Sequence, residues 1–210
     1  MNFRNHSAPV LLLGTLLSVP TLAASPARLK VAPVMPMGAA LFPLGDVRLL
    51  DSPFRQAQET DKAYLLRLDP DRLMSHMRTN AGLKPKAASY GGWDKDGAGS
   101  VGHYLSACAQ MAQATGNAKV RQRVDYVVAE MVACQRAKGD GGLYAFAWDA
   151  DTWFPKLAAG EVIPVPVTAW YSAHKILAGL RDAWLLCGSI PARDALVRMG
   201  DWCITVTARL

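Results

Sequence analysis

Aromatic, acidic and histidine side chains gather between Tyr90 and Met111, in the stretch YGGWDKDGAGSVGHYLSACAQM. Trp93 and Asp94 lie in its glycine-rich first half, and His103 stands at the head of an apolar segment. An aromatic face can pack against the C–H face of a sugar ring, while carboxylates and imidazoles hydrogen-bond sugar hydroxyls. This combination of residue types predicts the rim of a carbohydrate-binding cleft.

A second histidine, His174, stands in a similar setting, because Trp170 and Tyr171 precede it at the start of another apolar segment. If loops at one rim of a helical ring converge, His103 and His174 can contact one ligand. The alternative is that both are ordinary histidines, hydrogen-bonded within a layer of packed helices.

Tyr144 and Trp148 supply further aromatic surface in the segment GDGGLYAFAWDADTW, which also carries Asp149. Paired carboxylates that flank an acetal are what glycosidases need. Aspartate is also a common turn former, so structural roles for these loop aspartates stay open. The sequence has no serine-hydrolase order, Walker loop or dinucleotide-binding loop.

Apolar periodicity and capping residues predict the helices that position these side chains. The predicted helical ranges are 54–68, 70–81, 101–115, 119–138, 170–187 and 192–210. Residues 47–54 are expected to form a short strand or an arm. The loop 84–100 is long for a connection, which favours a functional or mobile loop. Residues 139–153 are predicted to be a loop with a short strand.

Two parts of the chain are weakly similar to one another. HYLSACAQMAQATGN is followed by a helix containing DYVV, and HKILAGLRDAWLLCGS by a helix containing DWCI. Each unit reads as two antiparallel helices joined by a glycine turn. The sequence therefore predicts an all-α fold of αα-hairpins, arranged as an array or toroid, after a short extended N-terminal segment.

Size and composition limit the classes of partner. The chain has 210 residues with a formal net charge of +6, and 51% of its residues are hydrophobic. Its Lys and Arg residues are scattered without interleaved aromatics, so we predict a mildly basic solvated surface and no nucleic-acid partner.

Residues 1–24 have the pattern of a secretory signal peptide, with an apolar stretch over Pro9–Leu17 and small residues up to a cleavage site after Ala23 or Ala24. The apolar part is too short for a stable transmembrane helix. We therefore predict a secreted or periplasmic protein with no membrane contact after cleavage; an uncleaved N-terminal anchor is the alternative. Residues 25–42, rich in Pro and Ala, are expected to form an extended leader.

The four cysteines lie far apart in apolar helical patterns, with no C-x-x-C motif and no zinc-type Cys/His spacing. We predict that Cys108, Cys134, Cys187 and Cys203 are buried small hydrophobic residues. One disulfide between packed helices is the alternative, and a metal site built from these four alone is not expected.

Four blocks of sequence together resemble one family. YLLRLDPDRLMSHMRTNAGLKPKAASYGGWD, VGHYLSACAQMAQATGN, VVAEMVACQRAKGDGGLYAF and WYSAHKILAGLRDAW follow one another as in the amino-terminal part of the β-L-arabinofuranosidase-like glycoside hydrolases of family 127. The resemblance covers about residues 43–210. It implies part of an (α/α)6 barrel, followed by β-sandwich domains in full-length members. The implied reaction is retaining hydrolysis of L-arabinofuranosides or related glycans, by a cysteine thiolate on a zinc ion and a separate glutamate as general acid/base.

Carried over residue by residue, the resemblance assigns substrate binding to His174 of WYSAHK, and then to His103 of GHYLSA, Trp93 and Asp94. With Tyr144 these form the predicted glycan-binding set. No cysteine or glutamate here matches the zinc ligands or the acid/base, so no catalytic and no metal residue is assigned. Zinc is expected in full-length members only.

Close relatives carry a second Gly-His just before GHYLSA, where this chain has Gly99-Ser100. One hydrogen-bonding group is therefore absent, which leaves the sugar unassigned. We expect an N-terminal fragment of a secreted hydrolase that is inactive alone. The alternatives are a non-catalytic carbohydrate-binding helical module and an αα-repeat scaffold that binds protein partners.

Overall fold

The computed structural model describes residues 35, 38–39, 41–94, 100–144, 155–161 and 169–208. These residues form helices and connecting turns, with no strand among them, which confirms the all-α prediction. The predicted signal peptide, most of the 25–42 leader and the side chains of Trp148 and Asp149 lie outside the described residues.

The N-terminal part begins with a short 3-10 helix, η1 (Leu44–Asp46), and continues into α1 (Pro53–Arg67). Residues 47–50 are an arm without a strand, so the arm alternative holds. Ser52 caps α1, because its hydroxyl accepts a hydrogen bond from the Arg55 amide at 3.3 Å.

The next predicted helix is divided in two. Asp69 caps α2 (Pro70–Leu73), and α3 (Ser75–Asn80) follows after a break at Met74, so the prediction of one continuous helix is wrong. Gly82 then adopts φ +72°, which ends the helical run as expected.

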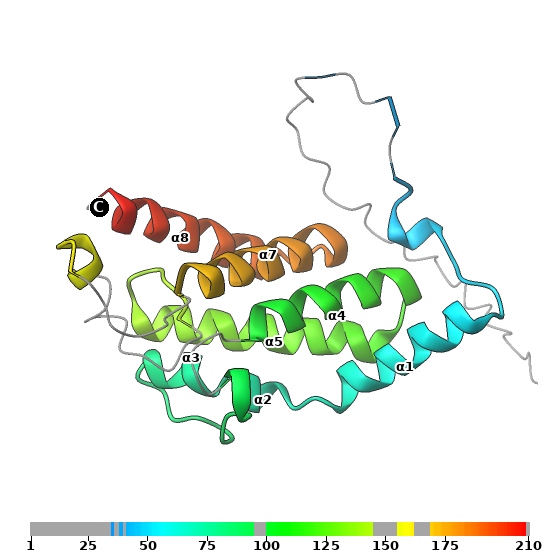
Figure 1. The fold of residues 1–210 in the computed structure, drawn as a ribbon, viewed down its shortest axis with the longest axis horizontal. Coiled ribbons are helices and arrows are strands. Elements are labelled where there is room, and N and C mark those ends of the chain that lie inside the picture. Colours follow the sequence, from blue (N-terminus) through cyan, green and yellow to red (C-terminus); the bar gives the residue numbers. More distant parts are fainter. Residues whose placement is uncertain are drawn as a thin grey trace, which may run out of the picture.

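Two αα-hairpins make up the body of the molecule (Figure 1). The first joins α4 (Val101–Thr115) to α5 (Ala118–Lys138), and the second joins α7 (Ala169–Cys187) to α8 (Ile190–Thr207). Each turn has two residues, a left-handed glycine and then a capping Asn117 or Ser189. The helix bounds agree with the sequence prediction within a few residues, and α8 starts earlier because Ser189 caps it.

The two hairpins lie side by side, with α4 against α7 and α5 against α8. Helices α4 and α7 run parallel, because Gly102 meets Lys175 near their N-termini and Ala109 meets Cys187 farther along. The equivalent helices of successive hairpins are therefore parallel, as a ring of stacked αα-hairpins requires. This arrangement agrees with the predicted part of an (α/α)6 barrel.

Two glycines bring α4 and α7 into backbone contact. A Cβ atom on Gly102 would lie 2.4 Å from the carbonyl carbon of Lys175, and one on Gly179 would lie 2.6 Å from the carbonyl oxygen of Gly102. Real Cβ atoms do not approach backbone so closely, so both positions require glycine.

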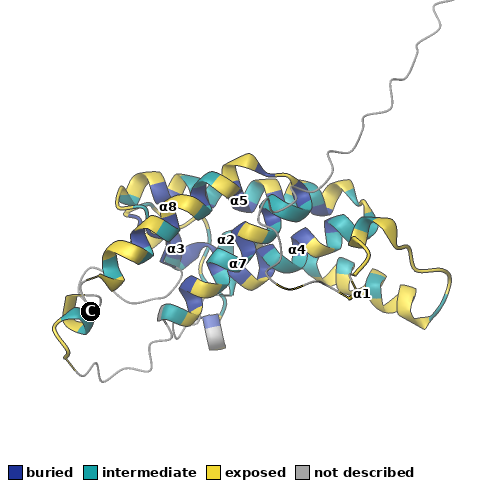
Figure 2. Cartoon of the chain, turned by 90° about the horizontal axis from the view of Figure 1, so that it is seen from above, coloured by how far each residue is buried: buried dark blue, intermediate teal, exposed yellow. Residues whose placement is uncertain are grey.

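The core lies between the hairpins, where Figure 2 shows buried residues on the facing sides of α4, α5, α7 and α8. Its largest fully buried side chains include Leu105, Met131, Ile176, Leu180 and Met199. Helix α1 contributes no buried residue. Hydrophobic burial therefore stabilises the paired hairpins much more than α1.

The four cysteines are free thiols, three of them buried and Cys203 half-buried. The prediction of buried small hydrophobic residues is therefore confirmed for Cys108, Cys134 and Cys187, whereas Cys203 is less buried than predicted. Burial raises the pKa of Cys108 and of Cys134 to about 11, so both stay protonated near neutral pH.

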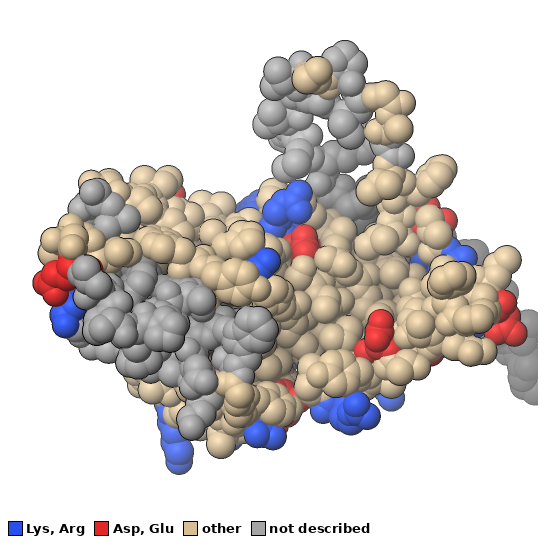
Figure 3. Space-filling model, viewed as in Figure 1, with Lys and Arg blue, Asp and Glu red and all other residues tan. Residues whose placement is uncertain are grey.

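On the face drawn in Figure 3, basic side chains are scattered among acidic ones. Within the described ranges, no helix combines the length and the apolar character needed to cross a bilayer. The predicted absence of a nucleic-acid partner stays a prediction.

Candidate functional site

The two histidines singled out in the sequence lie close together on one exposed surface. His103 Nε2 is 3.0 Å from the hydroxyl oxygen of Tyr171. The rings of His103 and Tyr171 are 5.7 Å apart between centroids, and those of Tyr171 and His174 are 6.5 Å apart. One tyrosine therefore bridges the two imidazoles, and we call His103, Tyr171 and His174 the histidine cluster.

The fold explains why these residues meet. His103 lies in the first turn of α4, and Tyr171 and His174 lie in the first two turns of α7. Because α4 and α7 are parallel, both N-termini lie at the same end of the hairpin pair. The contact between Gly102 and the Lys175 backbone then fixes the separation of the two helices beside the cluster.

The cluster is accessible but not fully solvated. All three side chains are exposed, Tyr171 by 42%. Partial burial lowers the pKa of His103 below its ordinary value of 6.5, and the positive charges of Lys175 and His174 add to this effect. A neutral imidazole has one donor and one acceptor nitrogen, so His103 can hydrogen-bond a hydroxyl group in either direction at neutral pH.

Tyr171 and Lys175 were not singled out as site residues from the sequence. The Lys175 ammonium is 5.0 Å from the centroid of the Tyr171 ring, which is a cation–π arrangement. The available signal was helical spacing, because Tyr171 precedes His174 by one turn and therefore shares its face.

Asp94 makes its contacts with residues outside the histidine cluster. Its side chain is 4% exposed, and Oδ1 accepts a hydrogen bond from the Ser100 amide at 3.2 Å. Burial raises its pKa, while His76 and Arg72 oppose that shift. Its Oδ2 is buried and finds no hydrogen-bond partner within the described ranges. Asp94 thus holds the start of α4, and its predicted contact with substrate stays a prediction.

The other two predicted residues add little to the cluster. Trp93 falls within the 3-10 helix Gly92–Asp94, but its side chain lies outside the described part of the structure. Tyr144 is 4% exposed and packs edge-on against Trp202, with 5.2 Å between ring centroids. Its hydroxyl donates to Asp140 at 2.6 Å. Sugar stacking by Tyr144 stays a prediction, and its burial counts against it.

A polar row continues from the cluster along α4. The Ser106 hydroxyl donates to the Asp182 carboxylate of α7, and Gln110 Nε2 lies 3.4 Å from the Ser106 oxygen. His103, Ser106 and Gln110 follow at helical spacing, so they share one face of α4. This face carries hydrogen-bonding groups over about two helical turns.

The zinc site that the resemblance implies for full-length members has no counterpart among the residues that the structure describes. Across the described ranges, no three His, Cys, Asp or Glu side chains come together as metal ligands. Burial raises the pKa of each of the four cysteine thiols, whereas a zinc ligand must be a thiolate. These residues do not fit zinc, so no chemical step is assigned to it.

Comparison with known protein families gives a match over most of the chain. The model of the β-L-arabinofuranosidase GH127 catalytic domain matches residues 46–210. No curated protein matches the chain. The matched range contains α1 to α8 as described above and the whole histidine cluster.

Proposed function

The chain belongs to the family of GH127 β-L-arabinofuranosidase catalytic domains, and on that premise we propose that its histidine cluster binds L-arabinofuranosides or related glycans. His103, Tyr171 and His174 contact the sugar hydroxyls in this proposal. The observation that carries it is the 3.0 Å contact between His103 Nε2 and the Tyr171 hydroxyl on an exposed surface.

The chemistry of the cluster supports sugar recognition. Three side chains with both donor and acceptor capacity lie together, because Tyr171 contacts both His103 and His174. The partly exposed Tyr171 ring adds an apolar face. Sugars present the same combination of hydroxyl groups and C–H faces. The lowered pKa of His103 keeps its acceptor nitrogen available at neutral pH.

Within the proposal these residues bind and orient the sugar, and none is assigned a catalytic role. Retaining hydrolysis needs a nucleophile and an acid/base on either side of the scissile bond. The residues in contact within the cluster supply no carboxylate. We therefore expect the 210-residue chain to bind glycan without measurable turnover.

Calorimetric titration of the purified chain with methyl β-L-arabinofuranoside tests this proposal. The substitution His174→Ala removes a sugar-facing group and should weaken binding about tenfold, which corresponds to about 1.4 kcal/mol. Arg193→Ala on the exposed side of α8 is the control and should leave the affinity unchanged. No saturable binding, or equal loss in both variants, would overturn the proposal and favour a protein-binding scaffold.

Export is a separate proposal that rests on residues 1–24. A positively charged start, an apolar stretch and small residues at the cleavage site are the features of a secretory signal peptide. We expect expression in a bacterial host to yield a mature chain in the secreted or periplasmic fraction. Protein sequencing should then find its N-terminus at Ala24 or Ser25, and an intact Met1 in that fraction would contradict cleavage.

A further inference from the structure

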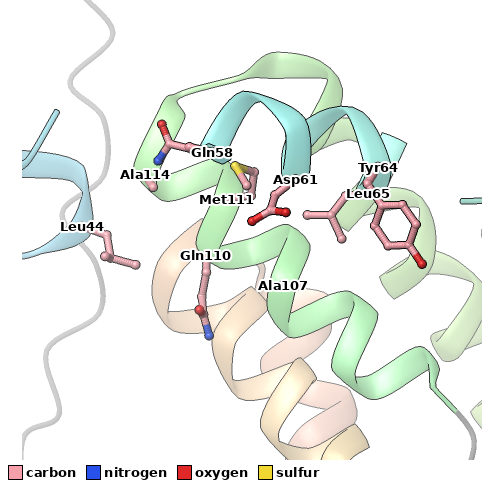
Figure 4. Close-up of a pocket in the computed structure, with 9 residues that line it drawn as sticks. All are labelled: Leu44, Gln58, Asp61, Tyr64, Leu65, Ala107, Gln110, Met111 and Ala114. Atoms are coloured by element: carbon pink, nitrogen blue, oxygen red, sulfur yellow. The ribbon is translucent and has the colours of Figure 1, made fainter. Parts of the chain in front are cut away.

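A groove of about 370 Å³ lies between α1 and α4, away from the histidine cluster. Leu44 of η1 lies at one end, and the remaining lining residues come from the two helices (Figure 4). Its volume is at the lower end of the ~300–1,000 Å³ usual for small-molecule sites. We call it the α1–α4 groove.

The groove exists because α1 is attached mainly by its C-terminal end. The Tyr104 hydroxyl donates to the Leu65 carbonyl at 2.9 Å, and Arg123 donates to the Leu68 carbonyl at 2.5 Å. Along the groove, two of the four lining residues of α4 are Ala107 and Ala114, whose side chains are too short to fill the space.

The lining combines an apolar floor with polar groups. Leu65 and Met111 supply apolar surface between the helices, while Gln58 and Asp61 add an amide and a carboxylate from α1. Tyr64 stands at one side with half of its surface exposed. Amides, a carboxylate and an accessible aromatic ring are the groups that hydrogen-bond and stack on sugars.

The charge of the groove-lining residues further limits the class of ligand that the groove can bind. Asp61 carries the only full charge among the groove-lining residues that the structure describes. An anionic ligand such as a sugar phosphate or a uronate would meet repulsion from this carboxylate. A neutral sugar instead uses it as a hydrogen-bond acceptor.

The groove is also continuous with the polar row on α4. Gln110 lines the groove and lies 3.4 Å from Ser106, which stands one turn from His103. The same face of α4 therefore carries residues of both the histidine cluster and the α1–α4 groove. A glycan chain has repeating units that can occupy two such places along one helix.

We propose that the α1–α4 groove is a second glycan-binding site that takes a neutral sugar unit. The ligand class rests on the proposed function of the histidine cluster. The site itself rests on the lining chemistry, the single carboxylate and the continuity through Gln110. Tyr64 and Asp61 are its expected principal contacts.

Methionine-methyl NMR of the full chain tests the groove separately from the cluster. Met111 lines the groove, while Met74, Met131 and Met199 are fully buried and serve as internal references. On titration with a neutral L-arabinofuranosyl disaccharide, we expect a saturable shift of the Met111 methyl signal. The reference signals should stay in place, and imidazole signals report the histidine cluster in the same sample.

Matched variants make the test decisive. Tyr64→Ala should weaken the Met111 response about tenfold, whereas Phe54→Ala, which removes another exposed aromatic from α1 outside the groove, should not. Gln110→Ala is a second groove variant on the other helix and should also weaken the response. His174→Ala should reduce the imidazole shifts and leave the Met111 shift.

Each other result has a defined meaning. If imidazole signals shift and Met111 does not, the groove inference falls while the proposed function stands. If His174→Ala abolishes both responses, the sugar binds at the cluster alone and the groove inference again falls. An equal Met111 response to glucose 6-phosphate would overturn the preference for a neutral ligand. If no signal shifts, both proposals fail.

Discussion

Helix α4 has two neighbours that it contacts in different ways. Against α7 the contact is backbone to backbone, because Gly102 and Gly179 leave no room for a Cβ atom. Against α1 the contact is made by hydrogen bonds at one end, and a groove of about 370 Å³ opens along the rest. The α7 side of α4 is therefore tightly packed, whereas the α1 side leaves space for a groove.

Small residues on α4 do not by themselves explain this difference, because both sides carry them. The α7 side supplies Ile176 and Leu180, whose side chains are fully buried. The α1 side supplies Gln58 and Asp61, whose burial without partners would cost free energy. We call the backbone contact between α4 and α7 the close seam; it combines small residues on one helix with apolar partners on the other. The histidine cluster lies at this seam, which we call the close side of α4.

The largest effect is expected from adding one methyl group to the close seam. In Gly102→Ala the new Cβ would lie 2.4 Å from the Lys175 backbone, which cannot rotate away. We expect a loss of about 3 kcal/mol in the free energy of unfolding, measured by urea denaturation followed by circular dichroism.

Gly200→Ala is the matched control, since Gly200 also lies inside a helix but has nothing within 4 Å of its added Cβ. Alanine there should raise stability by about 0.5–1 kcal/mol through helix propensity. Opposite signs for the two substitutions support the close seam, and equal effects would contradict it.

A smaller and more local effect is expected at α1. Arg123 donates to the Leu66 and Leu68 carbonyls and to the Tyr104 hydroxyl, so it secures the C-terminal end of α1. Arg123→Met should cost about 2 kcal/mol of local stability. We expect hydrogen exchange to speed up in α1 while the amides of α7 keep their protection.

Arg121→Met controls for the loss of an arginine on the same helix. Arg121 forms an exposed pair with Asp125, which is worth about 1 kcal/mol or less. Faster exchange in α1 with both variants, or with neither, would mean that Arg123 does not hold that helix in place.

The sequence predicted the hairpins well, and the two histidines that it singled out lie close together. Local signals determine the helix bounds, since capping and glycine turns involve neighbouring residues, as at Gly116 and Asn117. The meeting of His103 with Tyr171 depends on the parallel packing of α4 and α7. The repeated hairpin pattern predicted an array or toroid of hairpins, but it did not determine which helices of the two hairpins pack together.

Other features could not be read from local pattern. Gly102 and Gly179 look like ordinary helix glycines until the other helix is placed beside them. Tyr144 stands in an aromatic, acidic stretch, yet Trp202 from the far end of the chain buries it. The α1–α4 groove is likewise set by contacts between distant segments, so composition alone gave no sign of it.

The smallest expected effect concerns the charge state of the cluster on the close side. Burial lowers the pKa of His103, and the nearby charge of Lys175 lowers it further. Below pH 6.5 the unfolded chain therefore gains a proton at this histidine before the folded chain does, so acid disfavours folding here. We expect the NMR titration midpoint of His103 to lie below 6.5 in the folded protein.

Lys175→Gln removes the neighbouring cation and should raise that midpoint toward 6.5, because less repulsion opposes protonation. Lys119→Gln, near the turn at the opposite end of α4, should leave it in place. The shift should also shrink at high salt, since the cluster is exposed. An unchanged midpoint in Lys175→Gln would mean that α7 does not hold its first turns beside His103, and the close seam would then end before the cluster.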